Sequence, residues 1–117
     1  MDYLVLTQKT GRQQVPELQH QNDILRASLN RETSRIAWKE LLRFFAAGTV
    51  IAVSEELDLV EVAIQISNDN KALIEQWMLE KRVGKVSDAQ AKGWLETDTT
   101  LRAVVVRPWI LVQQAAE

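Results

Sequence analysis

The chain has 117 residues, of which 46% are hydrophobic and 26% are charged, the size and composition of a single globular domain rather than of a disordered segment. It contains no cysteine, which excludes disulfides and thiolate chemistry, and its net charge of −2 lacks the strong basic excess of nucleic-acid-binding domains. No apolar run approaches the roughly 18–20 residues of a membrane span, and Met1–Thr7 carries no basic leader, so we expect a cytoplasmic protein without a membrane partner.

Residues 1–22 are predicted to form a linker-like extension, and residues 23–117 a single domain. The stretch 8–23 is rich in glutamine and shows no apolar periodicity. Before it, Tyr3–Thr7 has the composition of a strand. This short stretch is either an edge strand or an unpaired tail.

The pattern becomes helical after residue 22. Leu25 and Leu29 lie four residues apart, and polar residues 30–35 then interrupt the apolar stripe. A second stripe follows at positions i, i+3, i+4 and i+7, formed by Trp38, Leu41, Leu42 and Phe45. We predict two helices, 23–34 and 37–47, or one helix bent between them.

Gly48 suits the left-handed residue that ends a helix, and the β-branched run 49–54 after it predicts a buried strand. The segment 58–67 fits two patterns, because its apolar residues alternate as in a strand while several also share one helical face. We favour a helix over a hairpin strand. The reason is the capping-box spacing of Asp58 and Glu61, in which an acidic N-cap accepts from the N3 amide and Glu61 reaches back.

The last part of the chain mixes helix and strand signals. Asn68–Asn70 predicts a turn or a helix start before a helix over about 70–82. Ser87 and Gln90 have a second capping-box spacing, which opens a short helix. The final stretch, Leu101–Gln113, has the strongest strand composition, and the proline inside it, Pro108, argues for an edge position or a bulge.

These signals predict an α+β fold. We expect four or five helices on one face of a small two- or three-stranded sheet made of residues 49–54 and 101–113, with residues 3–7 as the third strand if they pair. A terminal strand that is apolar on both sides would then leave one apolar face uncovered. We therefore expect a homo-oligomer, a symmetric dimer in the first instance, in which sheets pack face to face with Trp109 as the anchor.

Several strings match one known family in order and spacing. They are Trp38–Gly48, Leu57–Ala63, Asp69 with Trp77, Val86–Asp88, and Ala103–Gln113 with Pro108 and Trp109 at its centre. Over about residues 24–113 the chain resembles the bacterial family called domain of unknown function 2288. The resemblance implies a small bacterial cytosolic protein without a known activity, and it carries over no functional residues.

No residue pattern predicts a catalytic centre, a metal site or a cofactor. The single histidine, His20, lies in the glutamine-rich stretch and is expected on an exposed loop. Five acidic residues lack the spacing of a calcium loop: Glu55, Glu56, Asp58, Glu61 and Asp69. Helix capping accounts for two of them, Asp58 and Glu61. Four basic residues recur at every fourth position and would form a solvated basic stripe on a continuous helix: Arg31, Arg35, Lys39 and Arg43.

We expect a protein-interaction or assembly module without catalytic activity, and we retain a small-ligand-binding or regulatory domain as the alternative. A carboxylate-based enzyme and a nucleic-acid binder rank below both. The residues with the best case for binding are Trp109, Asp58, Glu61 and Asp69. The other three tryptophans lie on helical stripes and are expected in the core: Trp38, Trp77 and Trp94.

Overall fold

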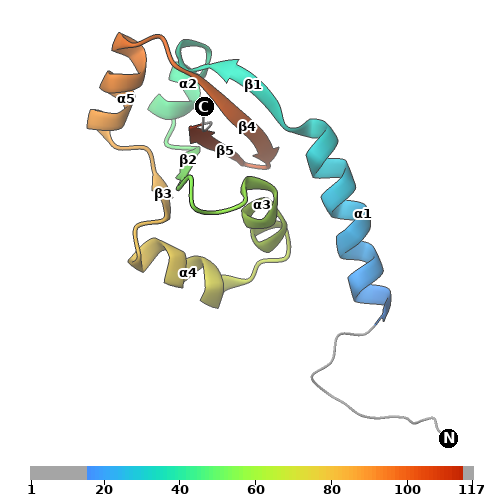
Figure 1. Ribbon diagram of the computed structural model, residues 1–117. Helices are drawn as coiled ribbons and strands as arrows, with labels where there is room; N and C mark the ends of the chain where they lie inside the picture. Colours follow the sequence, from blue (N-terminus) through green and yellow to red (C-terminus); the bar gives the residue numbers. More distant parts are fainter. Residues whose placement is uncertain (1–15, 115–117) are drawn as a thin grey trace, which may run out of the picture.

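The computed structural model describes residues 16–114, with side chains from residue 19 onward (Figure 1). Helices and strands are mixed along the chain. In order, the elements are helix α1 (Pro16–Glu32), strand β1 (Ser34–Ala37), the 3-10 helix η2 (Trp38–Leu41), helix α2 (Leu42–Ala46), strand β2 (Val50–Val53), helix α3 (Leu59–Ser67), helix α4 (Lys71–Leu79), strand β3 (Val83–Lys85), helix α5 (Asp88–Glu96), strand β4 (Thr100–Val106) and strand β5 (Trp109–Gln114).

The strands form one mixed sheet in the order β1-β4-β5-β2-β3. Only the central pair β2–β5 is parallel, and the other pairs are antiparallel. The α+β class is therefore confirmed, but the prediction of two or three strands is wrong. The two edge strands, β1 and β3, have four and three residues, too few to give a periodic apolar signal in the sequence.

The final apolar stretch is a hairpin rather than the single strand predicted over 101–113. Strands β4 and β5 pair antiparallel, with Val106 opposite Trp109. Arg107 and Pro108 lie between them as a two-residue turn. Proline lacks the amide hydrogen that a ladder needs, and in a turn that hydrogen is not required. Pro108 thus lies in the turn between β4 and β5 and not inside a strand.

The predicted helix 37–47 starts one residue later and as the 3-10 helix η2, which α2 continues, whereas the alternative of one bent helix from residue 23 is wrong. Thr33 closes α1, because its amide and hydroxyl both donate to the Leu29 carbonyl. The chain then extends as β1 and pairs with β4, so a strand separates the two apolar stripes and the chain does not continue as one helix. As a result the basic residues spaced by four do not form one stripe but lie on α1, β1, η2 and α2: Arg31, Arg35, Lys39 and Arg43.

Helices cover both faces of the sheet (Figure 1). Helices α1, α3 and α4 lie against the face that we call the first face, and η2, α2 and α5 lie against the second face. Side chains alternate along each strand, so Leu111 points into the first core and its neighbour Val112 into the second, and both are fully buried. The expectation that helices cover only one face is therefore wrong, and of the large apolar residues of the terminal hairpin only Val105 is more than half exposed.

The second core is centred on Trp38, which is completely buried. The rings of Phe45 and Trp94 meet its indole edge-on, with centroids 5.5 and 5.1 Å away. Such T-shaped contacts add about 0.5–1.5 kcal/mol each beyond the area they bury. The prediction that Trp38 and Trp94 belong to the core is confirmed, whereas Trp77 is only partly buried at the rim of the first core.

The helix predicted over 58–67 is confirmed as α3. Its N-cap is Asp58, whose carboxylate accepts from the amide of Val60 at 3.0 Å. The predicted capping box is absent there, because the Glu61 carboxylate accepts instead from the side chains of Arg26 and Gln65. Helix α5 has the complete predicted box. The backbone amide of Gln90 donates to the Ser87 hydroxyl, and the side-chain carbonyl of Gln90 accepts from the backbone amide of Ser87.

Two further boundaries bear on the predictions. Gly48 ends α2 with a φ of +78°, the left-handed conformation expected of it. Helix α1 begins at Pro16, so residues 16–22 are helical and not a linker as predicted. The division of the chain at residue 23 stays a prediction, and Tyr3–Thr7 lies outside the described residues.

Two substitutions in α5 should change the free energy of unfolding in opposite directions, and the first of them tests the capping account. Ser87→Ala removes the N-cap acceptor and should lower the free energy of unfolding by about 0.5–2 kcal/mol. Gly93→Ala should raise it by about 0.5–1 kcal/mol, because a Cβ there meets nothing within 4 Å and alanine restricts the unfolded chain. Urea unfolding measures both. A Ser87→Ala protein as stable as the wild type would refute the capping account.

Candidate functional site

The strongest candidate site is a hollow of about 340 Å³ on the first face, between the sheet and α4. Ligand-binding clefts commonly start at about 300 Å³ and have mainly apolar walls. The walls here are apolar and come from five different elements: Ile51, Ile66, Ile74, Met78, Val83 and Trp109. We call this feature the apolar hollow.

The strand pairing explains why these side chains converge. In the parallel pair β2–β5, Val50 lies opposite Ile110, so Ile51 and Trp109 are diagonal neighbours on the first face. Val83 joins them from β3, where it pairs with Val53 of β2. Together these residues form a floor across three strands, and α3 and α4 supply the wall above it.

Helix α4 covers this floor incompletely. Six of its nine residues are apolar, yet none is fully buried. Met78 is 54% exposed and Leu79 is 85% exposed. By contrast α3, of the same length, has five buried residues. An apolar helix whose contacts are so partial is the usual mark of a surface that a further molecule covers.

Four charged residues ring the mouth of the apolar hollow, two carboxylates and two ammonium groups: Asp69, Glu75, Lys71 and Lys85. Asp69 lies in the turn between α3 and α4 with a φ of +57°, and its carbonyl accepts from the Lys71 amide. Among the described residues, none of the four forms an ion pair. The mouth is therefore neutral as a whole and offers charges of both signs.

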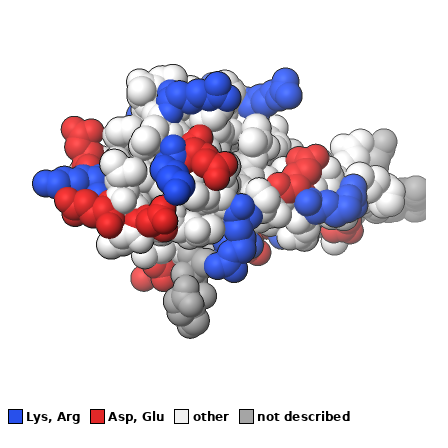
Figure 2. Space-filling model, turned by 90° about the horizontal axis from the view of Figure 1, so that it is seen from above, with Lys and Arg blue, Asp and Glu red and all other residues white. Residues whose placement is uncertain are grey.

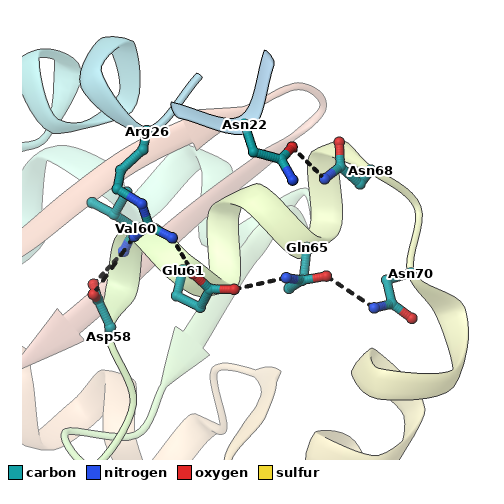
Figure 3. A network of polar contacts seen from close by, with 8 residues as sticks. All are labelled: Asn22, Arg26, Asp58, Val60, Glu61, Gln65, Asn68 and Asn70. Atoms are coloured by element: carbon teal, nitrogen blue, oxygen red, sulfur yellow. Dashed lines mark hydrogen bonds and ion pairs between the residues drawn. The ribbon is translucent and has the colours of Figure 1, made fainter. Parts of the chain in front are cut away.

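The four residues predicted to bind are divided between two places. Trp109 and Asp69 line the apolar hollow. Asp58 and Glu61 lie elsewhere, where α3 meets α1 (Figure 3). Arg26 of α1 binds the Glu61 carboxylate and lies 4.0 Å from that of Asp58. These two acidic residues therefore serve to dock α1, and the structure does not bring them to the hollow.

The contacts of Glu61 continue as a chain of polar side chains along α3 (Figure 3). Gln65 donates to Glu61 at 2.7 Å and accepts from Asn70 at 2.9 Å, and Asn68 donates to Asn22 at 3.1 Å. The hydrogen bond to Glu61 raises the pKa of Arg26 above its usual value, with the Glu61 and Asp58 charges adding to the effect and partial burial opposing it. Arg26 is thus a permanent cation that holds α1 to α3.

A second hollow, of about 380 Å³, lies beside the same edge strand on the second face. Its floor includes Ala52 and Gly84, and Trp94 forms one wall. Three basic side chains and one acidic side chain line it: Lys81, Arg82, Lys85 and Glu55. We call this feature the basic hollow. The sequence gives no sign of it, because its residues come from β2, β3, α4, α5, β5 and the turns after β2 and α4, and share no local motif.

Within the described residues, no three His, Asp or Glu side chains lie close enough to hold a metal ion. His20 is exposed, as predicted, but on α1 rather than on a loop. None of the helices that the structure describes is long and apolar enough to cross a bilayer. On the face seen in Figure 2, basic and acidic side chains are interspersed and form no continuous basic track.

The fold defines an α+β domain whose mixed five-stranded sheet carries helices on both faces. The profile of the family described as "Protein of unknown function (DUF2288)" matches residues 24–114, and the chain belongs to this family. It is also similar to PA1075 from Pseudomonas aeruginosa, known from an NMR solution structure, with 38% identity, a TM-score of 0.71, and coverage of 94% of this chain and 95% of that one. No curated protein matches the chain. The predicted family is confirmed.

The docking role of Arg26 can be tested by hydrogen exchange. Arg26→Ala should increase amide exchange in α1, while the sheet keeps its protection, because the Arg26 contacts join α1 to α3 only. The loss of global stability should be about 1 kcal/mol or less, since the pair is partly exposed to solvent. Arg31→Ala, in the last turn of the same helix, is the control and should leave exchange nearly unchanged. Equal effects of both variants would contradict this role.

Proposed function

We propose that this domain is a protein-interaction module that binds a second copy of itself through α4 and the apolar hollow, in the cytoplasm of a bacterium. The observation that carries the proposal is the exposure of α4. Bacterial origin is supported by the related solved protein, and a reducing compartment is consistent with the lack of cysteine. We call the side chains of Ile74, Met78 and Leu79, with the hollow beside them, the α4 surface.

The energetics favour covering this surface. Burying apolar area releases about 25 cal/mol per Å², so a side chain such as Leu79 contributes about 1.5–3 kcal/mol when it passes from water to a contact. Met78 stands beside it with half of its area in water. Helix α4 buries little of its apolar area in the monomer. A partner that packs on it would remove the remaining apolar area from water and be stabilised by that burial.

The charges around the apolar hollow suit a symmetric partner. In a two-fold dimer the same patch meets itself, so a patch of one sign would repel its copy. The mouth instead carries two carboxylates and two ammonium groups. Each cation can therefore face a carboxylate of the partner, which makes this surface self-complementary.

Trp109 keeps its predicted role as an anchor, for a different reason. It was expected to lie on a bare sheet face, but the helices on both faces remove that face. Trp109 instead lines the apolar hollow and remains partly exposed. A partner side chain that enters the hollow would meet the indole, and large aromatics commonly dominate interface energetics.

The alternative function, binding of a small apolar ligand, is supported by the volume of the hollow, about 340 Å³. The two functions differ in their dependence on protein concentration. A ligand that fills the hollow raises the melting temperature at any protein concentration, whereas a dimer becomes more stable as the protein is concentrated.

Sedimentation velocity tests the proposed dimer directly. Wild-type protein should sediment as a dimer at tens of micromolar, and Leu79→Lys should weaken the dimer by at least about tenfold, because it replaces a buried contact with a charge. Leu79 is 85% exposed in the monomer, so the substitution should leave folding intact. The matched control is Leu95→Lys on α5, where Leu95 is 50% exposed on the other side of the sheet. A monomeric wild type, or equal effects of the two variants, would contradict the proposal.

A further inference from the structure

The basic hollow has a definite structural origin. Ala52 of β2 and Gly84 of β3 are opposite one another in the antiparallel register, and both lie in the floor of the hollow. The two smallest side chains thus form one cross-strand pair and leave space above the second face. A Cβ added at Gly84 would meet nothing within 4 Å. The hollow is therefore a lack of side-chain volume at one place on the sheet, next to its outer edge.

The charge around this space is opposite to that of the whole chain. Three basic side chains and one acidic side chain give the hollow a balance of +2, while the protein carries −2. Lys81 forms no ion pair among the described residues, and Arg82 shares its guanidinium between Glu56 at 3.8 Å and Glu80 at 3.3 Å. Lys85 lines both hollows and Arg82 is paired with two carboxylates, so the unpaired positive charge of this one rests mainly on Lys81.

Neutral donors add to the cations. The Ser54 hydroxyl oxygen accepts from the Glu56 amide, which leaves its own hydrogen to donate. The Gln90 carbonyl oxygen accepts from the Ser87 amide, which leaves the Gln90 NH₂ group without an acceptor among the described residues. Both residues line the basic hollow. The helix cap therefore leaves the Gln90 NH₂ group as a donor in the wall of the same hollow as Lys81 and Arg82.

The remaining walls are apolar. Trp94 stands at one side with 9% of its surface exposed, and Ala52 is the partly exposed residue of the sheet next to it, since Val112 is fully buried. A ligand that matched the whole hollow would carry an anionic head group toward the cations and a compact apolar body toward the indole. Carboxylate and phosphate share the required head-group chemistry, since both accept several hydrogen bonds and pair with guanidinium and ammonium groups.

We propose that the basic hollow is a binding site for a small organic anion, a carboxylate or a phosphate monoester on a short apolar body. This site is argued separately from the proposed dimer, because its cations Lys81 and Arg82 do not line the apolar hollow. Met78, Val83, Gly84 and Lys85 nevertheless line both hollows, so a ligand on one side of β3 touches residues that also bound the other side.

Three probes with one common body test the proposal by NMR titration of the full chain: benzoate, phenyl phosphate and uncharged benzamide. At least one of the two anions should shift the signals of the Gly84 amide and the Trp94 indole in a saturable manner, and the one that binds more tightly identifies the head group. Benzamide should bind at least about tenfold more weakly. The affinity of the anion should also fall with rising salt, because the contacts are charged and open to solvent.

Two variants make the test specific. Lys81→Glu should weaken anion binding by at least about tenfold, since it replaces a cation with a carboxylate. Gly84→Val should abolish binding by filling the floor, yet retain the melting temperature, because its side chain enters open space. Gly93→Ala on α5 is the control and should bind as the wild type does. The proposal is overturned if neither anion shifts these signals at millimolar concentration, if benzamide binds equally well, or if Gly84→Val binds the anion unchanged.

Discussion

The β4–β5 hairpin is the part of the structure on which the rest depends. Its strands lie in the middle of the sheet, and β4 pairs with β1 while β5 pairs with β2. Side chains along both strands alternate between two cores, so neighbours such as Val104 and Ala103 are buried on opposite faces. Because both faces of the hairpin carry buried apolar side chains, helices pack on both faces of the sheet.

The same packing explains why the candidate sites gather at one end of the sheet. The centre is covered by α1 and α3 on one face and by η2, α2 and α5 on the other. Strand β3 has only three residues, and α4, which packs near it, has none that is fully buried. The apolar and basic hollows lie on the two sides of this thin edge. The domain thus combines a buried core with an incompletely covered edge formed by α4 and β3, and this edge supports the proposed binding function.

Local signals identified the helices with caps and the strand segments 49–54 and 101–113, but not the two edge strands of the sheet. Asp58 and Ser87 marked the starts of α3 and α5, since an N-cap is a contact between residues two or three apart. Strands β1 and β3 could not be predicted, because their stability comes from partners such as Arg102 and Ala52, which are distant in the sequence. The candidate site was found only in part. Trp109 was suspected because it is a large aromatic after a proline. The hollow beside it is formed by the parallel register of β2 and β5, which the sequence does not show.

The central claim is that the edge of the domain formed by α4 and β3 is the surface that binds. Amide NMR spectra of the wild-type chain, recorded over a dilution series from millimolar to micromolar concentration, test this claim most directly. The account predicts concentration-dependent shifts in α4 and β3, at Ile74, Met78 and Leu79 above all, with α5 and β1 unchanged. Spectra that do not change on dilution, or shifts centred on Ser34–Ala37 at the opposite edge of the sheet, would contradict it.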